Sequence, residues 1–275
     1  MSSTKEAWNT AAPGWDAGYA WYARNTRALS DWFCRTVANV GARVLDLACG
    51  TGMPALAIAE RVGPGGRVVA TDLAPAMVEV TRRRAREAGL ANVDVLEMDA
   101  AGLRFEAGSF DAVTCACGLM FCPEPVQVVR EVRRVLAPGG RFAVAVWAEP
   151  EKNPFFTTAA KAIGSVLPSV PSAPDATGPF RLSDAGEVER LLRAGGLLEP
   201  TVEPMEMPFT LESVDEYWRI FTQFAPGVPE RLAGLAEQDR RRARDELRAE
   251  AERFIDGGVL RLKATALCAL GLGPR

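Results

Sequence analysis

The sequence of 275 residues contains no histidine and only three tyrosines. Without an imidazole, a protein lacks the commonest general base near neutral pH and the commonest nitrogen ligand for metal ions. Any general base must then be a carboxylate, a tyrosine, a cysteine or water. The candidates for this role are Asp16, Tyr19, Tyr22 and Tyr217. Their spacing favours none of them, so the catalytic residue stays unassigned.

The sequence also lacks long apolar runs and a strong charge of either sign. No stretch approaches the roughly 20 apolar residues of a membrane span, and residues 1–10 do not resemble a secretory signal. The 32 basic and 35 acidic side chains give a net charge of −3. We therefore expect a cytoplasmic protein with a small-molecule partner and neither a nucleic acid nor a membrane as partner. The arginine runs at 82–86 and 240–244 have acids nearby, which indicates solvated helix faces. The oligomeric state stays open.

Six cysteines are present, and a chain with this much apolar sequence does not need a disulfide framework, so we expect free thiols. Three of them, Cys115, Cys117 and Cys122, have the spacing C-x-C-x4-C. This spacing suggests a metal or soft-element site, but no histidine and no second pair completes four ligands. We therefore predict no metal.

Short β-rich runs alternate with helical ones along the chain, which is typical of a doubly wound parallel sheet. The sequence thus predicts an α/β fold with a seven-stranded, mostly parallel sheet and helical lid insertions. The strands are expected at 43–47, 67–71, 93–98, 110–115, 141–147, 202–207 and 259–270. Ser183 is a plausible N-cap for the helix that follows it, with Gly195 as the C′ residue.

The predicted organisation divides the chain into six consecutive parts. A helical cap at 1–42 precedes the core at 43–148, which is expected to bind a cofactor. A proline-rich lid insertion at 149–183 follows the core. The core continues at 184–210, a helical lid insertion covers 211–257, and a final strand covers 258–275. Insertions at strand ends of an α/β fold are typical places for lids that close over a substrate.

The stretch V-L-D-L-A-C-G-T-G-M-P-A at 44–55 reads as a buried strand, a glycine turn and the start of a helix. It fits the dinucleotide pattern G-x-G-x-x-A, and Asp72, 20 residues after Gly52, could accept from ribose hydroxyls. Two further acids separate a dinucleotide site from a site for an S-adenosyl nucleoside. Asp46 near the first strand tip suits a ligand's ammonium group, and Asp99 near the third suits an adenine amino group. A dinucleotide needs no such pair. The pair of acids favours an enzyme that uses an S-adenosyl nucleoside. A nicotinamide-dependent oxidoreductase and a non-catalytic S-adenosyl-binding protein remain the alternative functions.

The sequence resembles the class I S-adenosylmethionine-dependent methyltransferases, in particular the ubiquinone/menaquinone C-methyltransferase-like group. The matching segments lie at 44–52, 68–73, 98–100, 109–113, 118–121 and 130–141. The resemblance is continuous over 43–148 and implies a Rossmann-like methyltransferase fold with S-adenosylmethionine as cofactor. It implies contacts to the methionine part from Asp46, Ala48, Cys49, Gly50, Thr51 and Gly52. For the ribose, the adenine and the sulfonium it implies Asp72, Leu73, Met77, Asp99, Ala100, Cys115 and Ala116.

Two positions depart from the pattern of the family. Ala48 stands where the broader superfamily often has glycine, and Ala116 stands where some quinone C-methyltransferases carry a serine. The second departure leaves the methyl acceptor open, since fold analogy does not supply a substrate.

Aromatic side chains in the cap and the insertions favour a small, largely apolar acceptor. Methyl transfer is an in-line displacement, so alignment and exclusion of water are the protein's main tasks. The plain alternative is that these side chains pack the core. The predicted acceptor residues are Trp15, Tyr19, Tyr22, Met120, Phe121, Phe155 and Trp218.

Overall fold

The computed structural model describes residues 4–167 and 177–275. Five parallel strands form most of its sheet, and all but the edge strand at 93–97 have an apolar run that is buried between the flanking helices. They are β1 (Arg43–Leu47), β2 (Arg67–Asp72), β3 (Val93–Glu97), β4 (Phe110–Ala116) and β5 (Leu136–Trp147). Two antiparallel strands, β6 (Leu198–Leu211) and β8 (Val259–Leu272), complete the order β3-β2-β1-β4-β5-β8-β6. The predicted doubly wound, mostly parallel fold is confirmed.

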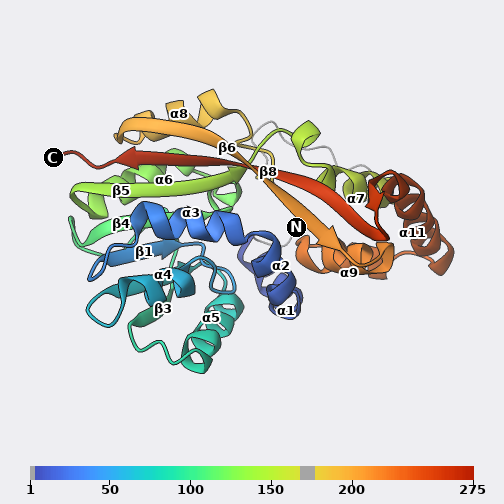
Figure 1. Cartoon of the computed structure of the whole chain (residues 1–275), viewed down its shortest axis with the longest axis horizontal. Coiled ribbons are helices and arrows are strands. Elements are labelled where there is room, and N and C mark those ends of the chain that lie inside the picture. Colours follow the sequence, from blue (N-terminus) through green and yellow to red (C-terminus); the bar gives the residue numbers. More distant parts are fainter. Residues whose placement is uncertain (1–3, 168–176) are drawn as a thin grey trace.

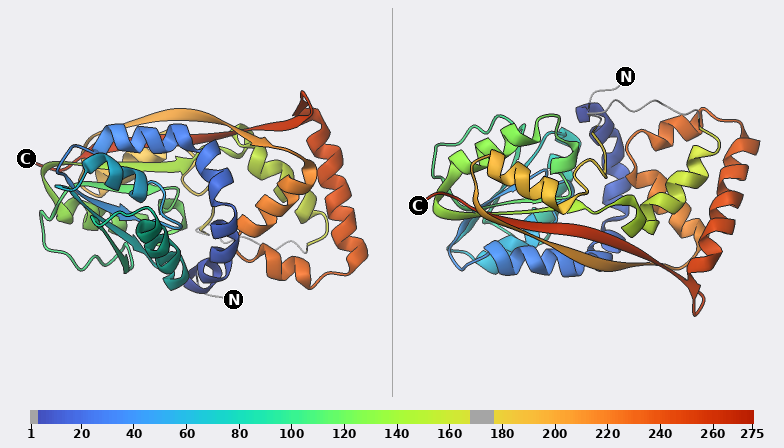
Figure 2. Two further views of the ribbon diagram at one scale, coloured as in Figure 1. Left: turned by 60° about the horizontal axis from the view of Figure 1, so that its bottom comes forward. Right: turned by 90° about the horizontal axis from the view of Figure 1, so that it is seen from above.

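Helices cover both faces of this sheet (Figure 1). Seen from above, α3 (Arg27–Val37) and α4 (Ala55–Val62) lie on one face, while α6 (Pro125–Val135) and α8 (Ala185–Ala194) lie on the other (Figure 2). Helix α5 (Pro75–Glu87) contacts β2 and β3. Residues 98–109, between β3 and β4, form turns and no helix.

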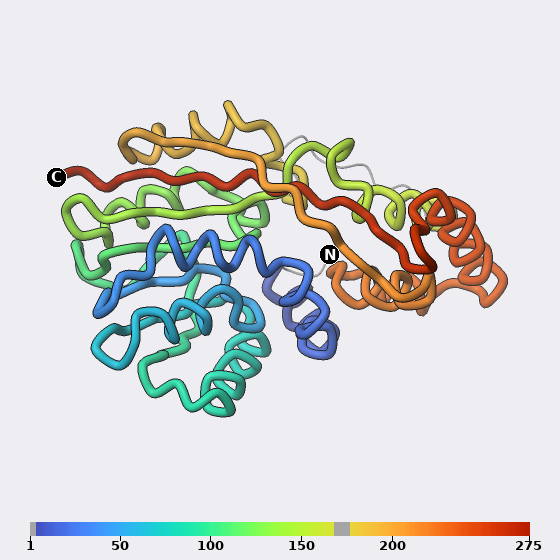
Figure 3. The backbone as a smooth tube through the Cα atoms, in the orientation of Figure 1, coloured from blue at the N-terminus to red at the C-terminus, as the bar shows by residue number. Residues whose placement is uncertain are grey.

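Strand β6 is much longer than the predicted strand at 202–207, whereas β8 extends the predicted strand at 259–270 by two residues. Each has 14 residues, and they pair with each other from Leu198↔Leu272 to Leu211↔Leu260. Strand β5 pairs with β8 only as far as Ala266, so residues 206–211 and 260–265 continue as a two-stranded ribbon (Figure 3). A two-residue strand, β7 (Ile255–Asp256), pairs with β8 and is an eighth strand that the prediction lacked.

The ribbon leads to a lobe of helices, which takes up much of the two predicted insertions. The second insertion forms α9 (Val214–Phe224), α10 (Val228–Ala233), α11 (Glu237–Ala251) and the short helix η3 (Glu252–Phe254). The described part of the first insertion forms η2 (Pro150–Lys152) and α7 (Pro154–Gly164), which packs on α11 and β8. Its residues 168–176 lie outside the described ranges. The cap forms α1 (Thr4–Ala17), α2 (Tyr19–Asn25) and α3, and α1 contacts both α5 and α9.

Two predicted helix ends are wrong by one residue. The N-cap of α8 is Asp184, whose side chain accepts a hydrogen bond from the Glu187 amide, and not Ser183. At the other end Gly195 is the C-cap with φ −79°, and the left-handed C′ position is Gly196 with φ +89°. In both cases the sequence offered two adjacent residues of suitable type, and only the backbone conformation distinguishes them.

None of the helices in the described ranges is both long enough and apolar enough to cross a lipid bilayer.

Candidate cofactor and acceptor site

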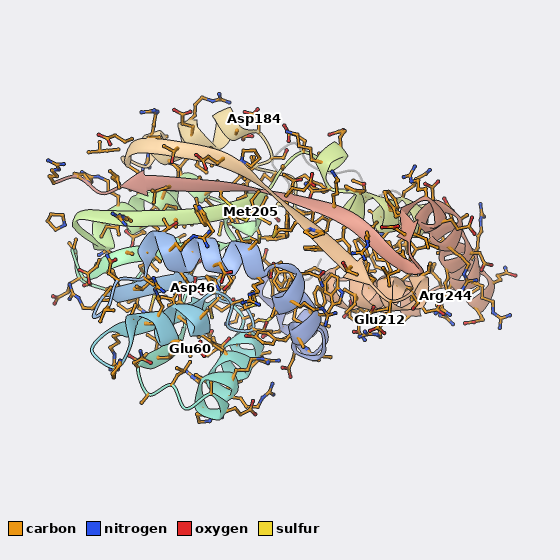
Figure 4. The ribbon with its side chains drawn as sticks, in the orientation of Figure 1. Asp46, Glu60, Asp184, Met205, Glu212 and Arg244 are labelled. Carbon is orange, nitrogen blue, oxygen red and sulfur yellow. The ribbon has the colours of Figure 1, made fainter. Side chains whose placement is uncertain are left out.

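Asp46 is the most strongly perturbed acid at the carboxyl ends of the central strands, next to the glycine turn (Figure 4). It is fully buried, and its Oδ1 accepts a hydrogen bond of 2.6 Å from the Thr114 hydroxyl on the neighbouring strand. Its Oδ2 is buried without a hydrogen-bond partner. Burial raises the pKa of Asp46 to about 7; the Thr114 hydrogen bond lowers it, and the nearby Asp72 carboxyl raises it. A buried, unsatisfied carboxylate oxygen is suited to a ligand that brings a hydrogen-bond donor or a positive charge.

Asp72, the last residue of β2, holds the glycine turn in place. Its Oδ2 accepts from the Gly50 amide and its Oδ1 from the Ala74 amide, each at 2.9 Å. Burial raises the pKa of Asp72, while the hydrogen bonds from Ala74 and Gly50 oppose that rise. A carboxylate oxygen accepts more than one hydrogen bond, so ribose hydroxyls could still be held here. Asp72 therefore also has a structural task that the sequence did not reveal.

The turn after β1 requires left-handed backbone at three positions. Gly50 and Gly52 have φ +54° and +107°, and Ala48 has φ +51°. A side chain in this region costs roughly 1–2 kcal/mol. The Ala48 methyl is accommodated because Gly118 faces it: a Cβ on Gly118 would lie 2.5 Å from the Cβ of Ala48. The departure from glycine at position 48 is thus matched by a glycine in the loop after β4.

Two threonines that the sequence pattern did not predict support the turn from both sides. The Thr81 hydroxyl on α5 donates to the Gly50 carbonyl at 2.7 Å, and Thr114 supports Asp46 as described. Thr114 could have been found, because in the parallel register of β1 and β4 it is the partner of Asp46.

The other residues that the resemblance assigns to the cofactor lie along the same edge of the sheet. Asp99, two residues after β3, is exposed, and its Oδ1 accepts from the Ala101 amide at 2.9 Å. Met77 is buried under α1 in a small cluster with Ala12 and Ala74, which Trp8 and Trp15 border. The remaining positions are buried, namely Cys49, Thr51 and Cys115, or partly exposed, namely Leu73, Ala100 and Ala116. Their contacts to the cofactor stay a prediction.

One aromatic cluster contains three of the predicted acceptor residues and two residues that were not predicted. The cluster consists of Trp8, Trp15, Tyr22, Phe121 and Phe224. Trp15 stacks on Phe224 with ring centroids 4.3 Å apart, and its Nε1 donates to the Phe224 carbonyl at 3.0 Å. Tyr22 lies 5.0 Å from Trp15, and Trp8 lies 5.1 Å from Phe121. The cluster therefore connects the cap, the loop after β4 and α9.

The other predicted acceptor residues lie elsewhere. Met120 is fully buried in the core, and Phe155 is buried against Trp21, 5.5 Å away between ring centroids. Tyr19 lies under the guanidinium of Arg84, whose carbon is 3.7 Å from the ring centroid. Trp218 borders a separate cavity in the helical lobe. Met120, Tyr19 and Trp218 make packing contacts outside the aromatic cluster. Phe155 reaches the cluster through Trp21, whose ring centroid lies 5.9 Å from that of Phe224.

None of the four candidate bases has a pKa suited to accepting a proton near neutral pH. Burial raises the pKa of Asp16, but its hydrogen bonds from Arg83 and Arg84, both 2.6 Å, outweigh this and lower it. Burial raises the pKa of all three tyrosines, most strongly for Tyr22 and Tyr217. The Tyr217 hydroxyl donates to the Phe155 carbonyl.

All six cysteines are free thiols. Within residues 4–167 and 177–275, no group of three or more histidine, cysteine or acidic side chains is arranged to hold a metal ion.

Comparisons with known proteins agree with this geometry. Residues 44–140 match the family model described as a methyltransferase domain. The demethylmenaquinone methyltransferase of Thermus thermophilus is 47% identical over 113 residues, which cover 41% of this chain and 50% of that protein. The enzyme of the same name from Lactococcus lactis is 37% identical over 123 residues, which cover 43% and 49%. The chain thus spans about half the length of the curated relatives it matches.

Solved structures show the same fold over more of the chain. The YcgJ protein of Bacillus subtilis has a TM-score of 0.60 at 21% identity and covers 90% of this chain and 98% of its own. A complex of the Haloferax volcanii Trm112 methyltransferase activator and a putative methyltransferase gives a TM-score of 0.61 at 21% identity, with full coverage of both chains. The strand order and the glycine turn with its buried acids agree with the family match, which assigns residues 44–140 to a methyltransferase domain.

Proposed function

We propose that the whole protein transfers a methyl group from S-adenosylmethionine to a small, largely apolar molecule. The observation that carries this proposal is the aromatic cluster. It borders the buried Met77 on the cofactor side through Trp8 and Trp15, and it reaches the loop after β4 through Phe121. Aromatic rings hold apolar and flat molecules through large contact areas, and they also tolerate a nearby positive charge.

The residues at the sheet edge fit the cofactor. Asp46 offers its unsatisfied Oδ2 to the ammonium group, and Asp72 offers its remaining lone pairs to the ribose hydroxyls. The cofactor supplies a methyl group on a positively charged sulfur. The chain then has to align the acceptor in line with that methyl and keep water away. Asp16 and the three tyrosines have no pKa near neutrality, and Asp46, whose pKa is about 7, is assigned here to the ammonium group of the cofactor. We therefore propose that the acceptor reaches the site in a form that needs no strong base from the protein.

The curated relatives are demethylmenaquinone methyltransferases, which makes quinol-like compounds the first acceptors to test. We further propose that nucleic acid is not a partner. Four arginines of the two runs are engaged within the protein: Arg83 and Arg84 bind Asp16, and Arg240 and Arg241 bind Glu237. The six free thiols fit a reducing compartment, and we propose the cytoplasm.

The test is a methylation assay with labelled S-adenosylmethionine and quinol, phenol, amine and thiol acceptors. Trp15→Leu and Tyr22→Leu should lower kcat/KM by roughly tenfold or more while the affinity for S-adenosylhomocysteine changes by less than about threefold. Trp32→Leu, in α3 and outside the aromatic cluster, is the matched control. Equal losses in all three variants would contradict the proposed acceptor site. Labelled tRNA or protein without any labelled small molecule, or binding of NADH in place of S-adenosylmethionine, would overturn the proposed function.

A further inference from the structure

Helices α9, α10 and α11 border a cavity of about 350 Å3. None of the residues assigned to the cofactor lines it. Figure 4 shows Arg244, which does line it, in the helical lobe at the opposite end of the molecule from Asp46. Small-molecule sites have volumes of roughly 300–1,000 Å3. The cavity is therefore large enough for a ligand of its own.

One wall of the cavity is apolar. It is formed by Trp218 on α9 and by Leu232 and Ala233 on α10. The guanidinium carbon of Arg244 lies 5.4 Å from the centroid of the Trp218 ring. A flat, apolar body placed against Trp218 would thus have a positive charge beside it.

The polar wall has more positive than negative charge. Three arginines line the cavity with one acid, Glu237. Arg240 is fully engaged, because it binds Glu237 and donates to the carbonyls of Leu232 and Leu235. Arg241 binds the same Glu237 through its Nε at 3.0 Å. In the part of the chain that the structure describes, Arg244 has no carboxylate partner. The planar guanidinium group matches the geometry of a carboxylate.

Gln223 also lines the cavity, and close contact with α1 holds its backbone, since a Cβ on Gly14 would lie 2.5 Å from the Gln223 carbonyl oxygen. Its Oε1 is buried without a hydrogen-bond partner and therefore does not face the open cavity. The polar recognition of a ligand thus depends on the arginines.

We propose that this cavity is a second binding site, separate from the cofactor, for a small aromatic carboxylate. The carboxylate binds Arg244 and Arg241, and the ring packs on Trp218 and Leu232. The site does not depend on the proposed acceptor, because the aromatic cluster does not line it.

The experiment follows the six tryptophan indole N–H signals by NMR in protein saturated with S-adenosylhomocysteine. Trp218→Phe identifies the signal of Trp218, and the probes are 3-hydroxybenzoate and its uncharged analogue 3-hydroxybenzamide. We expect 3-hydroxybenzoate to shift the Trp218 signal saturably and the amide to bind at least about tenfold more weakly. Arg244→Gln should weaken 3-hydroxybenzoate binding by about tenfold or more. Arg242→Gln, exposed on the same helix and outside the cavity, should change it by less than about twofold.

Three results would overturn the proposal. Equal affinity for the acid and the amide would show that no carboxylate is recognised. Equal losses in Arg244→Gln and Arg242→Gln would show only general attraction to a positive surface. A Trp218 signal that does not saturate, or that is unchanged while another indole signal shifts, would show that the ligand binds elsewhere or not at all.

Discussion

Replacing Asp46 by asparagine should stabilise the protein at alkaline pH and impair cofactor binding. The pKa of Asp46 is raised from an ordinary value of 3.8 to about 7 by burial. The folded state therefore holds a proton between about pH 4 and pH 7 that the unfolded state has released. Because the folded pKa is the higher one, the free energy of unfolding falls as pH rises through this window and is constant above it.

The size of the effect follows from the shift. A rise of about three in the pKa of Asp46 corresponds to a loss of about 4 kcal/mol in the free energy of unfolding by pH 8, and this value is an upper limit. Asp46→Asn removes this charge and keeps an oxygen that accepts from Thr114. Its amide nitrogen would take the place of the unpartnered Oδ2, and an unsatisfied buried donor costs about 1–3 kcal/mol. The net gain should thus be about 1–3 kcal/mol at pH 8 and should vanish or reverse at pH 5.

Urea unfolding of the wild type and Asp46→Asn at pH 5, 6, 7 and 8, without cofactor, measures this difference directly. The wild type should lose stability from pH 5 to pH 7 relative to the variant. Affinity for S-adenosylhomocysteine, measured at pH 8 by calorimetry, should be lower in the variant. The reasoning is refuted if the variant is the less stable protein at pH 8, or if the difference between the two proteins does not change with pH.

Three further predictions concern the same edge of the sheet. Below about pH 7 the affinity of the wild type for S-adenosylmethionine should fall by up to about tenfold per pH unit, because the positive charge of the cofactor favours the ionised form of Asp46. Calorimetry in two buffers should detect one proton released on binding. Gly118→Ala should lower the free energy of unfolding by about 1–3 kcal/mol, and adding Ala48→Gly to this variant should restore part of the loss. If urea unfolding shows no restoration, the contact between residues 48 and 118 is contradicted. Asp72→Ala should weaken S-adenosylhomocysteine binding by about 1–3 kcal/mol and also lower the melting temperature, since the Gly50 and Ala74 amides lose their acceptor; an unchanged melting temperature would refute its structural task.

The sequence alone determined the central sheet and the edge of it at which we propose the cofactor site. Apolar runs of four to six residues between helical segments read as parallel strands, and acids at their carboxyl ends meet at one edge by the topology of such a sheet. Asp46 and Asp72 could therefore be identified from local pattern. The glycines between them report a turn whose backbone conformation is set by residues adjacent in sequence.

Only the tertiary structure decided the full length of β6. Strand β6 contains Pro200, Pro204 and Pro208, and the first and last of these lie just outside the predicted strand at 202–207, where proline is typical of a strand end. They are tolerated because β6 is the edge of the sheet and pairs only with β8. Whether a strand is central or at an edge depends on the whole chain order, and no local window of sequence contains that information.

The aromatic cluster was decided in the same way. Trp15 and Phe224 are 209 residues apart in the chain, and their stacking depends on how α1 crosses α9. That crossing is close because Gly14 and Gly18 leave room for Gln223 and Phe224. Aromatic residues at helical spacing look alike in a sequence whether they face a core, a ligand or an arginine, as Tyr19 and Trp218 do here. Secondary structure follows from interactions between near neighbours, whereas the partners of a side chain are fixed only when distant segments pack together.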